Sequence, residues 1–329
     1  MNSTARDHWV GFDLGGTKML AVALNSADQP VGRARTKTRG AEGSAAGIKR
    51  IVGTIHEALQ SANVDVSRLA GIGVGCPGPL DLDRGILLNA PNLGWKDVPL
   101  KQELENAFGC PAVIANDVDI GVYGEYRFGA ARGAFCALGI FPGTGIGGGC
   151  VYRGEILRGK IGSCMEVGHM RVAPEGPRCG CGQRGCLEAV ASRLAICGAA
   201  VQAVYRGEAP ALAEACGTDL SNIRSKALAR SVAAGDVAIE RILRDAARTI
   251  GVGLASVVAL LSPDCVVLGG GLVEAMPELF VDEVESAARD AVLPSFRDVF
   301  EVRAAELGDD AAVRGAAALA RQHVEQITS

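Results

Sequence analysis

The stretch of sequence that decides the fold is HWVGFDLGGTKMLAVAL, residues 8–24. An apolar run from His8 to Asp13 ends at a Gly/Thr turn, and the apolar pattern resumes from Met19 to Leu24. Glycine in a tight turn between two apolar runs is typical of a β-hairpin. We therefore predict two strands joined by a turn.

The same pattern begins again near the middle of the chain. Residues 135–141 are apolar, Gly143-Thr144-Gly145 forms a turn, and residues 146–152 continue as a strand. The turn also matches G-x-G-x-x-G, but a dinucleotide site needs a helix after these glycines, and a strand follows here. Two hairpins of one kind, with strands and helices alternating after them, predict an α/β protein of two related lobes around a cleft.

Hydrophobic periodicity predicts the other main elements. We expect helices at 45–61, 236–261 and 274–291, buried strands at 69–76, 112–115 and 265–268, and a loop-rich stretch at 206–225.

Composition excludes several classes of protein. The 329 residues are 48% hydrophobic and 21% charged, which excludes a disordered chain. The 33 Lys and Arg are scattered among 37 Asp and Glu, so we expect no nucleic-acid partner. The N-terminus lacks the apolar core of a signal peptide, and the longest apolar run, 250–261, is too short to span a bilayer. We therefore expect no membrane association and a cytoplasmic protein with reduced thiols.

The first Gly/Thr turn has the chemistry of a phosphate site. Gly15 and Gly16 allow backbone N–H groups to approach phosphate oxygens, while Thr17 adds a hydroxyl and Lys18 a positive charge. Asp13, beside this turn, is a candidate ligand of Mg²⁺, directly or through water. The alternative is an ordinary hairpin turn.

A second acidic position follows the short strand at 112–115. Asp117 lies at the expected start of a helix, where a carboxylate can accept the proton of an attacking hydroxyl. Taken alone, Asp117 is better explained as a helix N-cap, which is the commoner role of Asp at such a position.

A cluster of soft ligands gives the sharpest motif. Cys179, Cys181 and Cys186 form C-x-C-x₄-C among glycines, and His169 supplies a fourth ligand. A closed Cys₃His set predicts a structural Zn²⁺, with unmetallated thiols as the alternative. Because Glu166 and Glu188 lie close to these ligands in sequence, the metal would fix both carboxylates.

Three further glycines, 269–271, follow the strand at 265–268. They suit the close approach of a base or ribose, and they suit equally a strand-to-helix turn that needs positive φ.

Taken together, these residues resemble the ROK family of sugar kinases and related repressors, in the actin/hexokinase-like superfamily. The resemblance covers nearly the whole chain, and its motifs are DLGGTK at 13–18, GCPGPLD at 75–81, NAPNLGW at 89–95, NDVDIGVYGE at 116–125, GTGIGGG at 143–149, EVGHM at 166–170 and CGCGQRGCLE at 179–188. The last two are the most specific. The fold implied is a two-lobed, ribonuclease H-like α/β fold, which we divide into a small lobe at 1–116 plus 310–329 and a large lobe at 117–309 carrying the zinc loop and the dimer helices.

The resemblance also implies residue roles. Asp117 is similar to the family's catalytic base. The residues implied to contact the sugar are Gly78, Asn92, Asn116, Asp117, Glu166, His169 and Glu188. Those implied to hold ATP and its Mg²⁺ are Asp13, Gly15, Gly16, Thr17, Lys18, Thr144 and Gly145, with Gly270 and Gly271 on the nucleoside side.

The activity implied is ATP-dependent phosphorylation of a neutral hexose by a homodimer. The stretch from Asn92 to Trp95 resembles the glucokinase-like form of its loop and favours glucose, with glucose 6-phosphate as product. The alternatives are kinases for N-acetylmannosamine, fructose, mannose or allose, polyphosphate as donor, and a weakly catalytic sugar-binding regulator. Repressors of the family usually carry an N-terminal helix-turn-helix, for which a first strand near His8 leaves no room.

Three positions depart from the family pattern. Cys164 and Met165 replace the usual small residues before Glu166 and would narrow the sugar pocket. Asp119 stands where Asn is common, and on a helix it would point away from Asp117, so we expect it to affect the base little.

Overall fold

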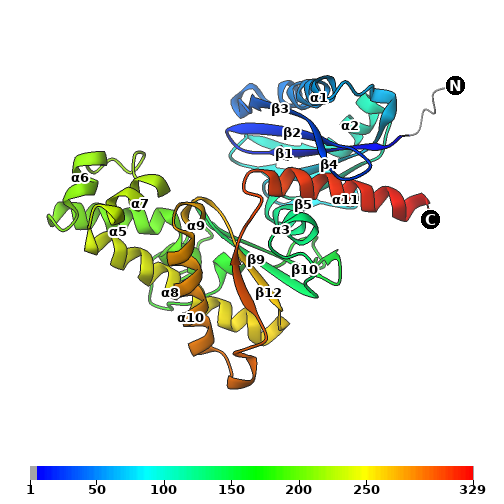
Figure 1. Cartoon of the computed structure of the whole chain (residues 1–329). Helices are drawn as coiled ribbons and strands as arrows, with labels where there is room; N and C mark the ends of the chain where they lie inside the picture. Colours follow the sequence, from blue (N-terminus) through cyan, green and yellow to red (C-terminus); the bar gives the residue numbers. More distant parts are fainter. Residues whose placement is uncertain (1–5, 329) are drawn as a thin grey trace. The chain divides into compact units, whose positions relative to one another are not determined.

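The structure is a computed structural model that describes residues 6–328; residues 1–5, part of the stretch in which we expect no signal peptide, and residue 329 lie outside the described residues. The chain divides into two compact units (Figure 1). Unit 1 combines the N-terminal residues up to Arg132 with Ile156–Cys164 and the C-terminal residues from Asp309 onward. Unit 2 consists of Gly133–Glu155 and Met165–Gly308.

Unit 1 is built on a five-stranded sheet of order β3-β2-β1-β4-β8. Strands β1, β2 and β3 are antiparallel neighbours, whereas β4 and β8 continue the sheet parallel to β1. The sheet strands are β1 (His8–Leu14), β2 (Lys18–Leu24), β3 (Pro30–Lys37), β4 (Leu69–Cys76) and β8 (Ala112–Asn116); a small second sheet holds β5 (Leu80–Asp81), β6 (Ile86–Ala90) and β7 (Trp95–Val98). The helices are α1 (Ser44–Ser61), α2 (Leu100–Phe108), α3 (Asp117–Phe128) and α11 (Asp310–Thr328), with short 3₁₀ turns η1 (Gly40–Glu42) and η2 (Val66–Arg68).

The two faces of this sheet bury different helices. Val10, Phe12 and Leu14 of β1 share one core with Ile51 and Ile55 of α1. On the opposite face α11 approaches the backbone of β1 and β4 so closely that a Cβ at Gly11 would lie 1.7 Å from the carbonyl oxygen of Val313. The alternation of side chains along a strand produces both packings.

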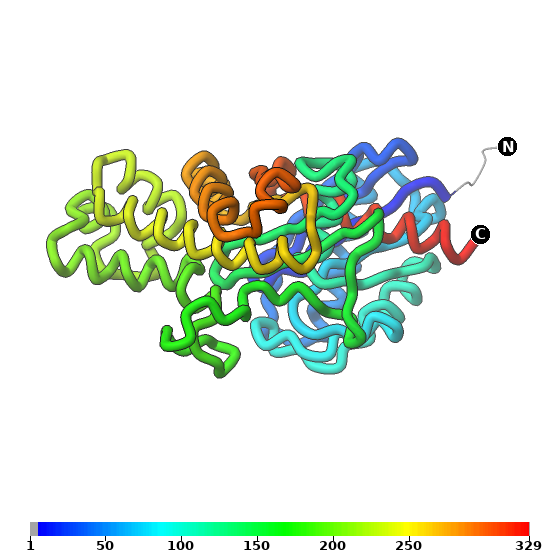
Figure 2. Tube along the Cα trace, turned by 90° about the horizontal axis from the view of Figure 1, so that it is seen from below, coloured from blue at the N-terminus to red at the C-terminus, as the bar shows by residue number. Residues whose placement is uncertain are grey.

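Unit 2 repeats this topology, with a sheet of order β11-β10-β9-β12-β13 that again begins with an antiparallel hairpin, β9 and β10, and adds parallel strands beside β9. Its strands are β9 (Cys136–Pro142), β10 (Ile146–Tyr152), β11 (Glu155–Ile156), β12 (Cys265–Leu268) and β13 (Glu301–Ala304). Its helices are α4 (Leu187–Ala191), α5 (Arg193–Tyr205), α6 (Pro210–Cys216), α7 (Ser225–Ala233), α8 (Val237–Leu261), α9 (Gly271–Ala275) and α10 (Pro277–Ala291), with η3 (Val167–His169) and η4 (Pro294–Phe296). The long helices α8 and α10 lie side by side (Figures 1 and 2).

Both predicted hairpins are present, but three expectations need correction. The stretch at 206–225 contains a helix, α6, which begins at Pro210 because proline is well tolerated in the first turn. The helix expected at 274–291 is interrupted at Met276, since Pro277 cannot continue the hydrogen-bond ladder of α9. The predicted lobe boundary between residues 116 and 117 would separate α3 from α11, although the two helices pack on each other. Division of the chain by contacts instead places α3 and residues 156–164 in unit 1.

One helical segment, Leu187–Tyr205, is long and apolar enough to cross a membrane by length and composition. Ser192, in extended conformation, interrupts it between α4 and α5. Ala191, Ile196 and Ala200 of the segment are fully buried in the core of unit 2. Packing within the folded unit therefore explains the apolar character of this part of the segment, whereas Leu194 and Tyr205 are exposed.

Candidate active site

Thr38, which the sequence analysis did not predict, stabilises the Gly/Thr turn of unit 1 through two hydrogen bonds. The buried side chain of Thr38 donates a hydrogen bond of 2.6 Å to the carbonyl oxygen of Gly15, and its backbone N–H donates one of 2.9 Å to that of Thr17. Gly16, Thr17 and Lys18 are exposed. Because a fixed turn loses little conformational freedom when a ligand binds, Thr38 prepares it for binding.

Lys18 lies beside the turn, paired with a carboxylate from the far end of the chain. Its Nζ is 3.1 Å from Asp309 Oδ2, and Arg35 donates to the same oxygen at 2.8 Å. The hydrogen bonds from Lys18 and Arg35 lower the pKa of Asp309. Asp309 was not predicted, since only the fold brings it next to Lys18.

Two further carboxylates occupy the same part of unit 1. Asp13 is the penultimate residue of β1, and Asp117 is the first residue of α3. Burial, followed by the negative charges of Asp117 and Asp309, raises the pKa of Asp13 to about 6. Burial also raises the pKa of Asp117, against the opposing hydrogen bond that Val118 N–H donates to Asp117 Oδ1 at 2.9 Å. Clustered carboxylate oxygens that disfavour their own ionisation are a donor set suited to Mg²⁺.

The structure assigns the capping role at α3 to Asn116 rather than to Asp117. Asn116 Oδ1 accepts hydrogen bonds from Val118 N at 2.9 Å and Asp119 N at 3.3 Å. The N-cap alternative for Asp117 is therefore wrong, and its carboxylate is not needed to begin the helix. Asp119 is buried.

The two other predicted sugar residues of unit 1 lie on exposed turns. Gly78 has φ of +82°, and a Cβ there would lie 2.2 Å from the carbonyl oxygen of Asn89, so only glycine fits. Asn92 is exposed, whereas Trp95, three residues later, is buried in the core and places its indole N–H 3.4 Å from the carbonyl oxygen of Gly40. Trp95 thus anchors the loop that presents Asn92.

In unit 2 the structure brings the four predicted metal ligands together. The ligand atoms of His169, Cys179, Cys181 and Cys186 all lie within 4.8 Å of one another. The distance from Cys179 Sγ to His169 Nδ1 is 3.6 Å, and that from Cys181 Sγ to Cys186 Sγ is 3.7 Å. Zinc bonds of about 2.3 Å to sulfur and about 2.0 Å to nitrogen separate tetrahedral ligand atoms by about 3.5 to 3.8 Å. The residues therefore fit a four-coordinate zinc ion.

Glu188 connects this cluster to the second Gly/Thr turn. Its Oε2 accepts a hydrogen bond of 3.1 Å from Ile146 N, and the thiol of Cys179 lies 3.6 Å from its Oε1. A Cβ at Gly145 would lie 2.2 Å from Glu188 Oε2. Glu166 is exposed at the start of η3, where its carbonyl oxygen accepts from His169 N at 2.9 Å. The Glu188 carboxylate thus contacts the cluster directly, whereas Glu166 is joined to it through the backbone hydrogen bond from His169.

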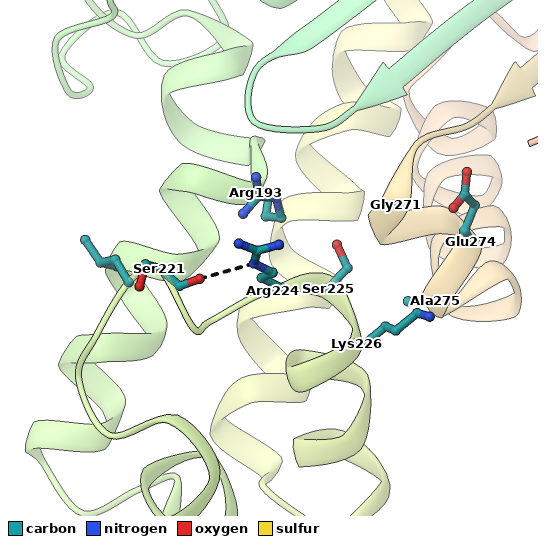
Figure 3. Close-up of a pocket in the computed structure, with 9 residues that line it drawn as sticks. Arg193, Ser221, Arg224, Ser225, Lys226, Gly271, Glu274 and Ala275 are labelled. Carbon is teal, nitrogen blue, oxygen red and sulfur yellow. Dashed lines mark hydrogen bonds between the residues drawn. The ribbon is translucent and has the colours of Figure 1, made fainter. Parts of the chain in front are cut away.

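The three glycines after β12 have different surroundings in the structure. A Cβ at Gly269 would overlap the ring of Phe141, and Gly270 has φ of +84°, so both satisfy the strand-to-helix turn. Gly271 instead lines a pocket of about 850 Å³ (Figure 3). The lining residues are Arg193, Leu220, Ser221, Arg224, Ser225, Lys226, Gly271, Glu274 and Ala275.

Arg193 joins this pocket to the second Gly/Thr turn. Its Nη2 donates a hydrogen bond of 2.7 Å to Thr144 Oγ1, and its backbone N–H donates one of 2.9 Å to the carbonyl oxygen of Gly143. Arg193 and the pocket cations Arg224 and Lys226 were not predicted, because isolated basic residues without spacing or periodicity give no signal in a single sequence.

The comparisons with known proteins extend over almost the whole chain. The model of the ROK family matches residues 9–323. A glucokinase of Halalkalibacterium halodurans is 35% identical over 96% of this chain and 96% of its own. The solved structure of a ROK hexokinase from Thermus thermophilus has a TM-score of 0.82 at 35% identity, covering 97% of this chain and 99% of that one. A ROK family glucokinase from Streptomyces griseus, solved with glucose and AMPPNP, has a TM-score of 0.81 at 33% identity, covering 96% and 99%. The predicted α/β fold is confirmed.

Proposed function

The chain belongs to the ROK family, and from this premise we propose that it is an ATP-dependent glucokinase, which transfers the γ-phosphoryl group of ATP to glucose and forms glucose 6-phosphate. The observation that carries the proposal is the position of Asp117. This carboxylate begins α3, is released from capping by Asn116, and lies in the same part of unit 1 as Asp13 and the exposed Gly/Thr turn.

Asp117 acts as the general base. Burial raises its pKa, which brings its basicity closer to that needed to accept a proton from a sugar hydroxyl at neutral pH. As the hydroxyl attacks the γ-phosphorus, Asp117 takes its proton, and the bond from that phosphorus to the bridging oxygen of ADP breaks. Asp13 is the residue that would hold Mg²⁺, which when bound offsets the charge of the phosphates.

Unit 2 supplies carboxylates for a neutral sugar and a pocket for the donor. Glu188 and Glu166 accept hydrogen bonds from hydroxyl groups and would repel a sugar acid. The Cys₃His cluster would hold a structural zinc ion, which when bound would fix Glu188 through its contact with Cys179 and Glu166 through the backbone of His169. Thr144, Gly145 and the pocket beside Gly271 receive the phosphates and the nucleoside. A homodimer and a cytoplasmic location stay predictions.

The test is coupled ADP release from Mg-ATP by zinc-replete protein against a panel of neutral sugars. We expect glucose to give the highest kcat/KM, with N-acetylmannosamine, fructose, mannose and allose well below it. A maximum at another sugar would replace the substrate and keep the mechanism. No ADP release with any sugar, and no phosphorylation from polyphosphate, would contradict the kinase assignment and favour a sugar-binding regulator.

The role of Asp117 is tested separately with Asp117→Asn. We expect turnover to fall by at least about a thousandfold, with glucose affinity by calorimetry within a fewfold of wild type. The matched control is Asp83→Asn, an exposed aspartate of unit 1 in the turn between β5 and β6, for which we expect wild-type turnover. Normal turnover by Asp117→Asn would exclude it as the base.

A further inference from the structure

Arg193 lies where the donor pocket of unit 2 meets the second Gly/Thr turn. It is the first residue of α5, its guanidinium bonds Thr144 Oγ1 at 2.7 Å, and it also lines the pocket (Figure 3). The backbone bond from Arg193 N to the carbonyl oxygen of Gly143 fixes the same turn. One residue therefore contacts both the turn and the pocket.

The bond to Arg193 determines what the Thr144 hydroxyl can do. A threonine hydroxyl has one hydrogen to donate and two lone pairs that accept. Because the guanidinium occupies a lone pair, the hydroxyl hydrogen remains available for another acceptor, and the adjacent positive charge polarises it. Both effects favour a negatively charged oxygen as that acceptor.

The charge of the pocket wall points to the same class of ligand. Arg193, Arg224 and Lys226 place three cationic side chains around it, against the single carboxylate of Glu274. Arg224 is oriented by a bond of 3.2 Å from its Nε to the carbonyl oxygen of Ser221, drawn in Figure 3. An excess of positive charge at the mouth of a pocket attracts a polyanion rather than a neutral molecule.

We propose that Arg193 is a specificity-determining residue for the phosphoryl donor: it orients the Thr144 hydroxyl toward the donor's phosphate chain and supplies a positive charge for that chain. The donor is a nucleoside triphosphate whose phosphates lie at Thr144 and Arg193 and whose nucleoside enters the pocket beside Gly271. This inference rests on the proposed kinase function. It adds that the phosphate chain, and not the nucleoside, is the part of the donor that Arg193 recognises.

The decisive experiment compares ligands with and without phosphates on the full-length protein. Affinities for ADP and for adenosine are measured by calorimetry for wild type, Arg193→Ala, Arg193→Lys and the control Arg230→Ala, an exposed arginine on α7 outside the pocket lining. For Arg193→Ala we expect ADP to bind about 10- to 100-fold more weakly, as for the loss of a charged hydrogen bond, with adenosine binding unchanged. Arg193→Lys keeps a positive charge but lacks the planar guanidinium with its several donors. Its affinity for ADP should therefore lie between those of wild type and Arg193→Ala.

Kinetics give a second readout that a merely structural role would not produce. Arg193→Ala should raise KM for Mg-ATP by a similar factor and leave KM for glucose at the wild-type value. Equal losses of ADP and adenosine affinity, or an unchanged KM for Mg-ATP with unchanged ADP binding, would overturn the proposal. If wild-type protein releases no ADP with any sugar, the kinase function fails, and the ADP and adenosine comparison still decides whether Arg193 recognises phosphate.

Discussion

Replacing Asp13 by Asn should make the free protein more stable while abolishing turnover. The pKa of Asp13 rises from 3.8 to about 6 on folding, because β1 removes the carboxylate from water and places it near the charges of Asp117 and Asp309. At 1.36 kcal/mol for each pKa unit, folding disfavours its ionised form by about 3 kcal/mol. Asn has nearly the same shape and carries no charge, so Asp13→Asn removes this cost at neutral pH.

The stability gained by Asp13→Asn should depend on pH in a defined direction. A carboxyl group whose pKa is higher in the folded state contributes most to stability below about pH 4 and loses that contribution as the pH rises through about 6. The advantage of Asp13→Asn is therefore largest above pH 7 and disappears near pH 4. Urea unfolding of zinc-replete protein without added Mg²⁺, followed by tryptophan fluorescence, measures this advantage well, because Trp9 and Trp95 are the two tryptophans and both lie in unit 1.

Asp309→Asn is the matched control, for which we expect the opposite change in stability. Lys18 and Arg35 lower the pKa of Asp309, so its ionised form stabilises the folded state, and its replacement should slightly reduce stability at neutral pH. If Asp13→Asn were no more stable than wild type at pH 7.5, or if its advantage persisted at pH 4, the reasoning from desolvation and carboxylate repulsion would be refuted.

Three further predictions concern the base, the metal and the second turn. Burial of Asp117 raises its pKa, so the acidic limb of the kcat profile should have its midpoint above pH 3.8; a midpoint at or below 3.8 would contradict this. Metal analysis should find one zinc per chain in wild type; Cys181→Ser should lose this zinc and bind glucose more weakly, whereas Cys216→Ser, outside the cluster, should keep both the zinc and the affinity. Gly145→Ala places a Cβ 2.2 Å from Glu188 Oε2 and should raise KM for glucose about tenfold or more; an unchanged KM would show that Glu188 does not bind the sugar.

The parts of the fold that the sequence predicts well depend on local patterns. Each Gly/Thr turn lies between two apolar runs, and such a turn specifies a hairpin without help from the rest of the chain. The metal cluster is predictable for a similar reason, since three of its four ligands lie within residues 179–186 and need only a short loop to converge. The interruption before Pro277 was visible as a proline, but apolar periodicity on both sides concealed it.

The residues that escaped prediction act across long separations in sequence. Thr38 supports the turn at Gly15, Asp309 pairs with Lys18 and Arg193 bonds Thr144, and each pair is joined only by the tertiary fold. A single polar residue has no period and no spacing, so its neighbours in space cannot be inferred from its neighbours in the chain.

The free-energy cost of burying the ionised Asp13 and its proposed role as a magnesium ligand are thermodynamically linked. A cation that binds beside Asp13 relieves the repulsion from Asp117 and Asp309, so the free energy lost on folding is partly recovered on binding. Linkage then requires the cation to stabilise wild type more than Asp13→Asn, with a difference no larger than about 3 kcal/mol if relief of this repulsion is its source. Unfolding of both proteins with and without Mg-ADP measures that difference, and equal stabilisation of the two would show that Asp13 is not where the cation binds.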